Sequence, residues 1–240
     1  MNRKRTQRVY LDNRVYNYII EKIINSKYKQ GEMIRIDAIA DELKISRTPV
    51  TQAIKTLASE DILTLTSTGK AYIPIFTPKQ LVDIYQTRIA VEKYAVEALC
   101  CREDRTDIYR SLNHIQTVCR NCFERSAYLE YRKEDLLLHR TLVELTENEY
   151  LYGLFVKIQN MFMISNYLVG THTLEQQQLS LEEHDQLIKA IYEGNKETAV
   201  CSIENHIIRA LKQVLSKFAL DVTEESMRAL NPKGEEDNEI

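Results

Sequence analysis

Apolar residues recur with a helical period in three separate stretches of the first sixty residues. The first stretch follows Asp12 or Asn13, either of which is placed to cap a helix. The second is short and ends at a turn at residues 44–45. Ser46 is placed to cap the third, whose first turn carries Pro49. The apolar positions of these three predicted helices are Val15, Tyr18, Ile19, Ile23, Ile24, Ile36, Ile39, Ala40, Leu43, Val50, Ala53, Ile54 and Leu57.

Two short β-prone runs follow the three helices. Residues 64–66 and 71–73 are rich in Thr, Tyr and Ile, and residues 67–70 join them as a hairpin turn. Three helices, the second and third closely spaced, followed by a β-hairpin indicate a winged helix-turn-helix. We expect this DNA-binding domain to cover residues 10–76, after a basic N-terminal extension over residues 1–9.

The rest of the chain repeats the helical period over longer stretches and contains no convincing strand. Thr77 caps and Pro78 opens a helix that runs to about Cys101. Breaks are expected at residues 146–148 and 194–195. Only 6 Gly and 4 Pro in 240 residues favour long helices. The predicted fold class is therefore mainly α, with an all-helical bundle over residues 77–220 and an acidic, disordered tail over residues 221–240. The further predicted helices cover residues 107–125, 128–146, 149–169, 178–193 and 197–219.

The charge balance differs between the two predicted domains. Residues 1–75 carry 13 Lys and Arg against 8 Asp and Glu, whereas the remaining residues carry 19 against 27. This asymmetry suggests that only the first third meets a polyanion. No apolar run approaches the roughly 20 residues that a membrane span needs, and no secretory signal follows the basic N-terminus. We therefore expect a cytoplasmic protein without membrane contact.

The polar face of the third predicted helix carries the candidate DNA contacts. Arg can bond guanine, Gln can bond adenine, and Thr suits a phosphate or a thymine methyl group. At the turn of the hairpin, Gly69 permits close backbone approach and Lys70 can neutralise a phosphate. A polar stripe of this kind is also what a solvated helix face looks like. The candidate residues on the helix are Arg47, Thr48, Thr51, Gln52 and Lys55.

One carboxylate and three imidazoles form a candidate metal site in the helical region. Asp135 and His139 are four residues apart, so they share one face of a helix. His184 and His206 come from two later helical stretches. Such a set is a normal ligand shell for one divalent ion per chain, Zn²⁺, Ni²⁺ or Mn²⁺. The alternative is four unrelated polar residues.

The cysteines do not form a recognisable framework. Five cysteines are present, an odd number that argues against a set of disulfides. Cys119 and Cys122 have the spacing of a zinc or redox pair, but they lie inside a helical pattern and no second pair follows. We interpret them as half-buried helix cysteines.

The first seventy residues resemble the GntR family of bacterial regulators. The resemblance runs from Gly31 to Leu57, and its specific part is the core Ser-Arg-Thr-Pro-Val at residues 46–50. It implies that Arg35, Arg47, Thr48 and Gly69 contact operator DNA. With Ser46 of the core and the polar residues named above, these complete the predicted DNA-binding set. The family's usual Arg-Glu after Pro-Val is Thr51-Gln52 here, so the operator need not be the family's usual one.

The helical region resembles the FCD-type effector domain of the FadR-like branch, nearer its six-helix VanR-like subgroup. Residues 139–151 and 183–194 carry the resemblance, and many members bind a metal through an Asp-x3-His pair and two later His. This pattern matches Asp135, His139, His184 and His206 position by position. A Gly is common in the family where Glu147 stands here. The implied effector is a small organic or sugar acid.

Arg88 has two competing interpretations. In the resembling domains an Arg at this position often faces the ligand cavity, where it would hold an effector carboxylate together with the metal. Alternatively, Arg88 and Glu92 form a surface ion pair four residues apart on one helix.

The function predicted from the sequence is a DNA-binding transcriptional regulator. We expect a homodimer on a near-palindromic double-stranded operator, with affinity controlled by a carboxylate effector at the metal site. One alternative is a metal or metabolite sensor that acts through protein partners without DNA. Another is a metal-dependent hydrolase, against which stands the lack of a His-Glu-x-x-His motif, a nucleophile elbow or a phosphate loop. We therefore expect no enzyme activity.

Overall fold

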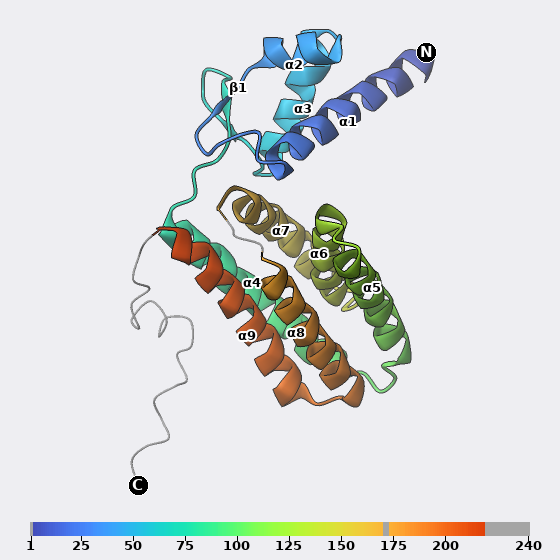
Figure 1. Ribbon diagram of the computed structural model, residues 1–240. Helices are drawn as coiled ribbons and strands as arrows, with labels where there is room; N and C mark the ends of the chain where they lie inside the picture. Colours follow the sequence, from blue (N-terminus) through green and yellow to red (C-terminus); the bar gives the residue numbers. More distant parts are fainter. Residues whose placement is uncertain (1, 170–172, 219–240) are drawn as a thin grey trace. The chain divides into compact units, whose positions relative to one another are not determined.

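The computed structural model describes residues 2–169 and 173–218, and within these ranges the chain forms nine α-helices, one short 3₁₀ helix and one three-stranded sheet (Figure 1). The described residues fall into two compact units, 2–77 with 160–169, and 78–159 with 173–218. The predicted fold class is confirmed: helix-turn-helix elements with a small sheet are followed by a helical bundle. The predicted acidic tail, residues 221–240, lies outside the described residues.

The helices of the first unit match the prediction except at the N-terminus. The helices are α1 (Asn2–Ile24), α2 (Ile36–Leu43) and α3 (Arg47–Ser59). The prediction that α1 begins after Asp12 or Asn13 is wrong, because the helix already begins at Asn2. Residues 2–9 contain no Gly or Pro and several residues of good helix propensity, such as Arg, Lys and Gln, so nothing in this segment ends the helix.

The turn between α2 and α3 brings the two helices into a helix-turn-helix. Lys44 takes a left-handed conformation, with φ of 54°, and ends α2. Ser46 occupies the predicted N-cap position of α3, but its side chain makes no capping hydrogen bond, which corrects that part of the prediction. The apolar face of α3 is buried as its spacing predicts. Its buried residues are Pro49, Val50, Ala53, Ile54 and Leu57.

The wing is a three-stranded antiparallel sheet, of which the sequence predicted two strands. β3 (Ala71–Tyr72) lies between β1 (Met33–Ile34) and β2 (Thr64–Leu65). Tyr72 faces Met33 on one side and Thr64 on the other. The unpredicted strand β1 is distant from β3 in the sequence, so no hairpin turn marks it as one marks β2 and β3. Gly69 in the β2–β3 turn has a positive φ of 78°, which suits a glycine.

The helices that follow confirm the six predicted from the sequence, with small differences at their ends. α8 begins four residues earlier than expected, and a 3₁₀ helix, Ser216–Phe218, follows α9. The predicted break at 194–195 is present: Gly194 ends α8 with φ of 72°, and Asn195 caps α9 by accepting from the Thr198 amide at 3.1 Å. The helices are α4 (Pro78–Cys100), α5 (Thr106–Glu124), α6 (Tyr128–Glu144), α7 (Glu149–Val169), α8 (Leu174–Glu193) and α9 (Lys196–Leu215).

In the second unit, α4 packs against α6, α8 and α9, and α5 packs against α6 and α8 (Figure 1). Large side chains such as Tyr85, Leu99 and Leu112 fill its core. Polar and charged side chains are buried in the same bundle, which is unusual unless they are paired or bind something. They come from helices far apart in the sequence and converge on the candidate site. None of the described helices is apolar over a length sufficient to cross a membrane.

Candidate metal centre and nucleic-acid surface

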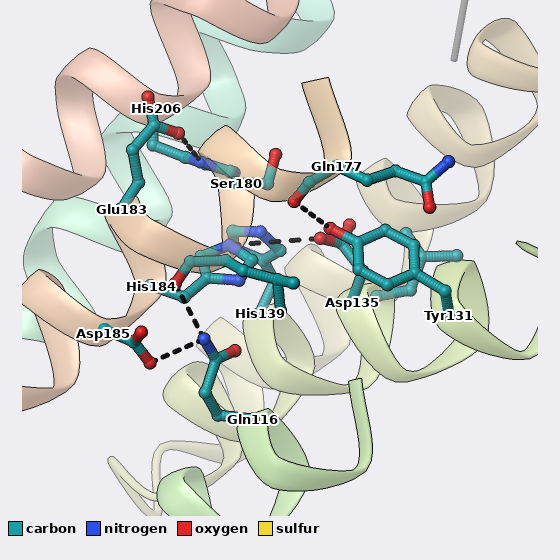
Figure 2. A network of polar contacts seen from close by, with 12 residues as sticks. Gln116, Tyr131, Asp135, His139, Gln177, Ser180, Glu183, His184, Asp185 and His206 are labelled. Carbon is teal, nitrogen blue, oxygen red and sulfur yellow. Dashed lines mark hydrogen bonds and ion pairs between the residues drawn. The ribbon is translucent and has the colours of Figure 1, made fainter. Parts of the chain in front are cut away.

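Three histidines from three helices meet inside the bundle. His139 lies on α6, His184 on α8 and His206 on α9, and all three side chains are buried. One ligand nitrogen from each lies within 4.8 Å of the others. The ring centroids are 4.6 to 5.1 Å apart, and Figure 2 shows the imidazoles gathered between the helices. The structure thus brings together three of the four predicted metal ligands.

Several nitrogen atoms of this cluster are buried without a hydrogen-bond partner. They are Nε2 of His139 and both ring nitrogens of His184. A buried polar atom left unpaired costs on the order of 1–3 kcal/mol. Imidazole nitrogens that converge from three helices and lack partners are the donor set that a borderline divalent ion takes. The residues present therefore fit a metal ion.

The protonation state of the cluster also suits metal binding. Burial lowers the pKa of His139 well below 6.5, and the nearby Arg88 and His206 lower it further. Burial also lowers the pKa of His184 well below 6.5, with His206 and His139 acting in the same direction. Both rings are therefore neutral near pH 7, and neutral imidazole is the form that ligates a metal.

Asp135, the fourth predicted ligand, lies beside the cluster. Its Oδ1 is 4.0 Å from Nε2 of His184, too long for a hydrogen bond, and its side chain is 27% exposed (Figure 2). The four-residue spacing places Asp135 and His139 on one face of α6, as expected. Asp135 thus lies beside His184, outside the group of three histidines whose ligand atoms lie within 4.8 Å of one another.

Two glutamates that the sequence analysis did not select contact the histidines. Glu92 Oε2 lies 2.6 Å from Nδ1 of His139, and Glu183 Oε2 lies 2.7 Å from Nδ1 of His206. Glu183 directly precedes His184, so its position beside the cluster was open to prediction. Glu92 is 47 residues from His139 and offered no such signal.

Each glutamate is also held by an arginine. Arg88 Nε donates to Glu92 Oε1 at 2.5 Å, and Arg209 donates to both oxygens of Glu183 at 2.7 and 2.6 Å. Burial raises the pKa of Glu92, against the opposing effect of Arg88. Burial alone would raise the pKa of Glu183 too, but hydrogen bonds from His206 and Arg209 lower it to about 2.

The Arg88–Glu92 pair corrects one interpretation of Arg88. The pair exists, but its side chains are 4% and 0% exposed, so it is not a surface ion pair. The sequence could not show this, because α4 packs against three helices and is buried around much of its circumference.

Gln116 adds another buried acceptor to the network. Its Nε2 donates to the Leu181 carbonyl and to Asp185, each at 2.8 Å, and its Oε1 is buried without a partner. Gln116 lies near His184 in Figure 2. The sequence analysis missed it, since a lone Gln on an amphipathic helix carries no signal.

The predicted recognition face of α3 is exposed, but its arginine is paired. Thr48, Gln52 and Lys55 are exposed, and Thr51 is half-buried with its hydroxyl donating to the Arg47 carbonyl at 3.0 Å. Arg47 Nε lies 2.8 Å from Asp37 on α2, in a pair whose side chains are about 70% exposed. The side chains of Thr48, Gln52 and Lys55 therefore remain exposed to solvent beside the ion pair.

The other predicted DNA contacts lie at turns of the first unit. Arg35 is exposed at the N-cap position of α2, and Ser46 is exposed at that of α3. Gly69 and Lys70 are exposed in the wing, and no atom lies within 4 Å of where a Cβ of Gly69 would be. The wing is therefore open for backbone approach to a ligand.

The remaining sequence candidates lie apart from the histidine cluster or outside the described residues. Cys119 and Cys122 are free thiols and fully buried, more so than predicted. Burial raises the pKa of the Cys119 thiol, which disfavours the reactive thiolate. His114 is exposed on α5, and His172 lies outside the described residues.

Comparisons with known proteins agree with the two units. Residues 11–73 match the family described as bacterial regulatory proteins, gntR family, and residues 83–209 match the FCD domain. The chain is 27% identical to the HTH-type transcriptional regulator YdhC of Bacillus subtilis (strain 168), over 84% of this chain and 91% of that protein. It is 23% identical to the gluconate operon transcriptional repressor of the same organism, over 77% of each.

A solved structure shares the fold. The match to E. coli McbR/YncC has a TM-score of 0.72 at 16% identity, and covers 87% of this chain and 98% of that one.

Proposed function

Because the chain belongs to the GntR family of bacterial regulators with an FCD domain, and is thus a transcriptional regulator and not an enzyme, we propose that a metal-bound carboxylate effector controls its affinity for operator DNA. The DNA-binding domain covers residues 10–76 and the effector domain residues 77–220. The protein acts in the cytoplasm, where a bacterial operator lies. The observation that carries the proposal is the buried three-histidine cluster with its unpartnered nitrogens.

The DNA-binding part of the proposal rests on α3 and the wing. Arg47, Thr48, Gln52 and Lys55 are exposed on or beside the N-terminal half of α3, where a recognition helix meets base edges. Lys70 in the wing contacts a phosphate. A single helix and wing make few contacts, so the protein binds as a homodimer to a near-palindromic operator.

The metal site comprises His139, His184 and His206, with Asp135 as the fourth ligand. One Zn²⁺, Ni²⁺ or Mn²⁺ per chain would supply positive charge and open coordination positions that attract a carboxylate. The chain's own residues exclude water from most of the cluster, and burial keeps His139 and His184 neutral by lowering their pKa values. A small organic or sugar acid is the effector class. One relative is named for the gluconate operon, which fits a sugar acid.

Two measurements on the purified full chain test this function. Metal analysis should find about one divalent ion per chain, removable by a chelator. A gel shift with the chain's own upstream DNA should show binding that changes by roughly 5- to 150-fold when gluconate is added to the metal-loaded protein, the usual range of allosteric coupling. A change in DNA affinity with a related acid instead of gluconate would also support the proposal. If neither the metal nor any acid of a panel changed the affinity for DNA, the proposal would be overturned.

The gel shift also separates the remaining alternative. A sensor that acts through protein partners would bind metal and acid without binding its upstream DNA. A specific shift, competed by unlabelled upstream DNA and not by unrelated DNA, excludes that alternative.

A further inference from the structure

Two histidines of the cluster are held in the same way by different helices. His139 on α6 contacts Glu92 on α4, and His206 on α9 contacts Glu183 on α8, each through Nδ1. The contacts are 2.6 and 2.7 Å long. In both cases the carboxylate occupies one ring nitrogen and leaves Nε2 for another partner. The same contact between a glutamate oxygen and Nδ1 of a histidine thus occurs in two different helix pairs. A single chance hydrogen bond does not explain this repetition.

The arginines behind the glutamates decide which atom carries the proton. An arginine guanidinium is a permanent cation, and that of Arg88 lies 2.5 Å from Glu92 in a buried ion pair, which favours the ionised form of the carboxylate. Glu92 is therefore ionised and can only accept hydrogen bonds. It follows that Nδ1 of His139 is the donor, and that Nε2 of this neutral ring has a free lone pair. At the second contact, Arg209 donates to the same oxygen of Glu183 that lies 2.7 Å from Nδ1 of His206, so Nδ1 is the donor there too.

We propose that Glu92 and Glu183 are positioning residues, which fix His139 and His206 as Nδ1–H tautomers so that both present Nε2 to the metal. The inference rests on the proposed function for the identity of the partner at Nε2. Arg88 acts on the cluster through Glu92, whose Oε1 accepts a hydrogen bond from its Nε. This gives Arg88 a third role, different from both interpretations that the sequence allowed.

The position of Glu92 links the metal site to α4. This helix begins at Pro78, directly after the DNA-binding domain, and carries both Glu92 and Arg88. A carboxylate that accepts a hydrogen bond from a metal-ligating histidine orients the imidazole ring, and its loss typically costs about 10- to 100-fold in metal affinity. His184 is the internal contrast, because neither of its ring nitrogens has a hydrogen-bond partner and the nearby Asp135, at 4.0 Å, is too far to fix its tautomer.

Glu92→Gln is the sharpest test, because the arginine forces the orientation of the new amide. Arg88 requires an acceptor, so the amide oxygen stays on Arg88 and the NH₂ group turns toward His139. Nδ1 of His139 then has to accept, and the ring proton moves to Nε2. We expect two-bond ¹H–¹⁵N correlation spectra of the metal-free protein to show this reversal at His139 alone. Zn²⁺ affinity from chelator competition should fall about 10- to 100-fold.

Two variants serve as controls. In Glu183→Gln the amide oxygen can remain where both His206 and Arg209 donate, so His206 keeps its tautomer and Zn²⁺ affinity falls less. Glu92→Asp keeps an ionised acceptor on a shorter arm, so it should retain the Nδ1–H tautomer at His139. It should also recover part of the Zn²⁺ affinity lost in Glu92→Gln, which a loss of packing would not explain.

The outcomes separate this inference from the proposed function. Nδ1–H tautomers at His139 and His206 in the metal-free wild type support the inference even if no Zn²⁺ binds, a result that would instead overturn the metal site. An Nε2–H tautomer at either ring overturns the inference even if Zn²⁺ binds. Wild-type Zn²⁺ affinity in Glu92→Gln also overturns it.

Discussion

The proposed recognition face of α3 and the histidine cluster of the bundle hold their polar groups in opposite ways. On α3 the side chains are exposed, and Arg47 forms an ion pair that solvent screens. In the bundle, Glu92 and Arg88 are buried, and three buried imidazole nitrogens have no hydrogen-bond partner. An exposed polar group is hydrated when no DNA is bound, so it costs the fold little stability. A buried unpaired group lowers the stability of the fold until a ligand binds it. Ligand binding and stability should therefore be strongly linked in the bundle and weakly linked on α3.

The largest expected effect comes from His184→Leu, which removes two buried, unpartnered nitrogens. Wild-type protein should gain about 4 kcal/mol when free Zn²⁺ reaches about a thousand times its Kd. The variant should show no such gain, and without metal it should be at least as stable as the wild type, because an apolar group costs nothing to leave unpaired. Urea unfolding with and without chelator measures both.

The exposed His114 provides the control for that experiment. His114→Ala should keep the wild-type response to Zn²⁺ and to chelator. If metal-free His184→Leu were several kcal/mol less stable than metal-free wild type, the two nitrogens would not be a cost that metal relieves. The contrast between the two sites would then lose its energetic basis.

The next effect is on the DNA-binding side. Arg47→Ala should weaken operator binding by about 1–3 kcal/mol and relax discrimination at one base pair of each half-site. Lys70→Ala should instead weaken all sequences alike and flatten the dependence of affinity on salt. Neither variant should change the melting temperature, because both side chains are exposed. Gel shifts at fixed salt with single-base operator variants measure the discrimination, and unchanged affinity in Arg47→Ala would show that α3 is not the recognition helix.

The same contrast explains what the sequence predicted well. The six helices from α4 to α9 were predictable because apolar residues recur at helical spacing over several turns of each helix. The exposure of the proposed recognition face was predictable because its polar residues lie on one short segment of the chain. Strand β1 was missed because no hairpin turn joins it to β3, and α1 was started too late because Asp12 and Asn13 look like caps although the helix runs through them.

The buried site was predicted only in part, for a related reason. The spacing and the family resemblance identified His139, His184 and His206, which the structure brings together. They did not identify Glu92, because its contact with His139 joins two helices 47 residues apart. The burial of the Arg88–Glu92 pair depends on how many helices pack around α4, and a pattern along one helix does not reveal that.

A smaller effect is expected at the turn between α6 and α7. Glu147 has a positive φ of 59°, a conformation that costs a residue with a side chain roughly 1–2 kcal/mol. Glu147→Gly relieves this strain but loses an exposed 3.3 Å ion pair with Arg102, so we expect a net gain of about 1 kcal/mol. Glu144→Gly, at the last residue of α6, should destabilise by a similar amount. Thermal unfolding of the metal-free protein gives both signs, and a destabilised Glu147→Gly would contradict the argument.

The smallest effect tests whether the ion pair on the recognition face matters. Asp37 holds Arg47 at 2.8 Å, so DNA has to replace a carboxylate before Arg47 can contact it. Asp37→Asn should therefore raise operator affinity by a few-fold and steepen its salt dependence, within the range expected of an exposed pair. Asp41→Asn removes the same charge from an exposed position on the same helix and should have less effect. In an Arg47→Ala background the gain from Asp37→Asn should shrink to that of Asp41→Asn, because the partner it released is gone. Equal gains from both substitutions in the wild-type background would mean that net charge, and not the pair, limits binding at this surface.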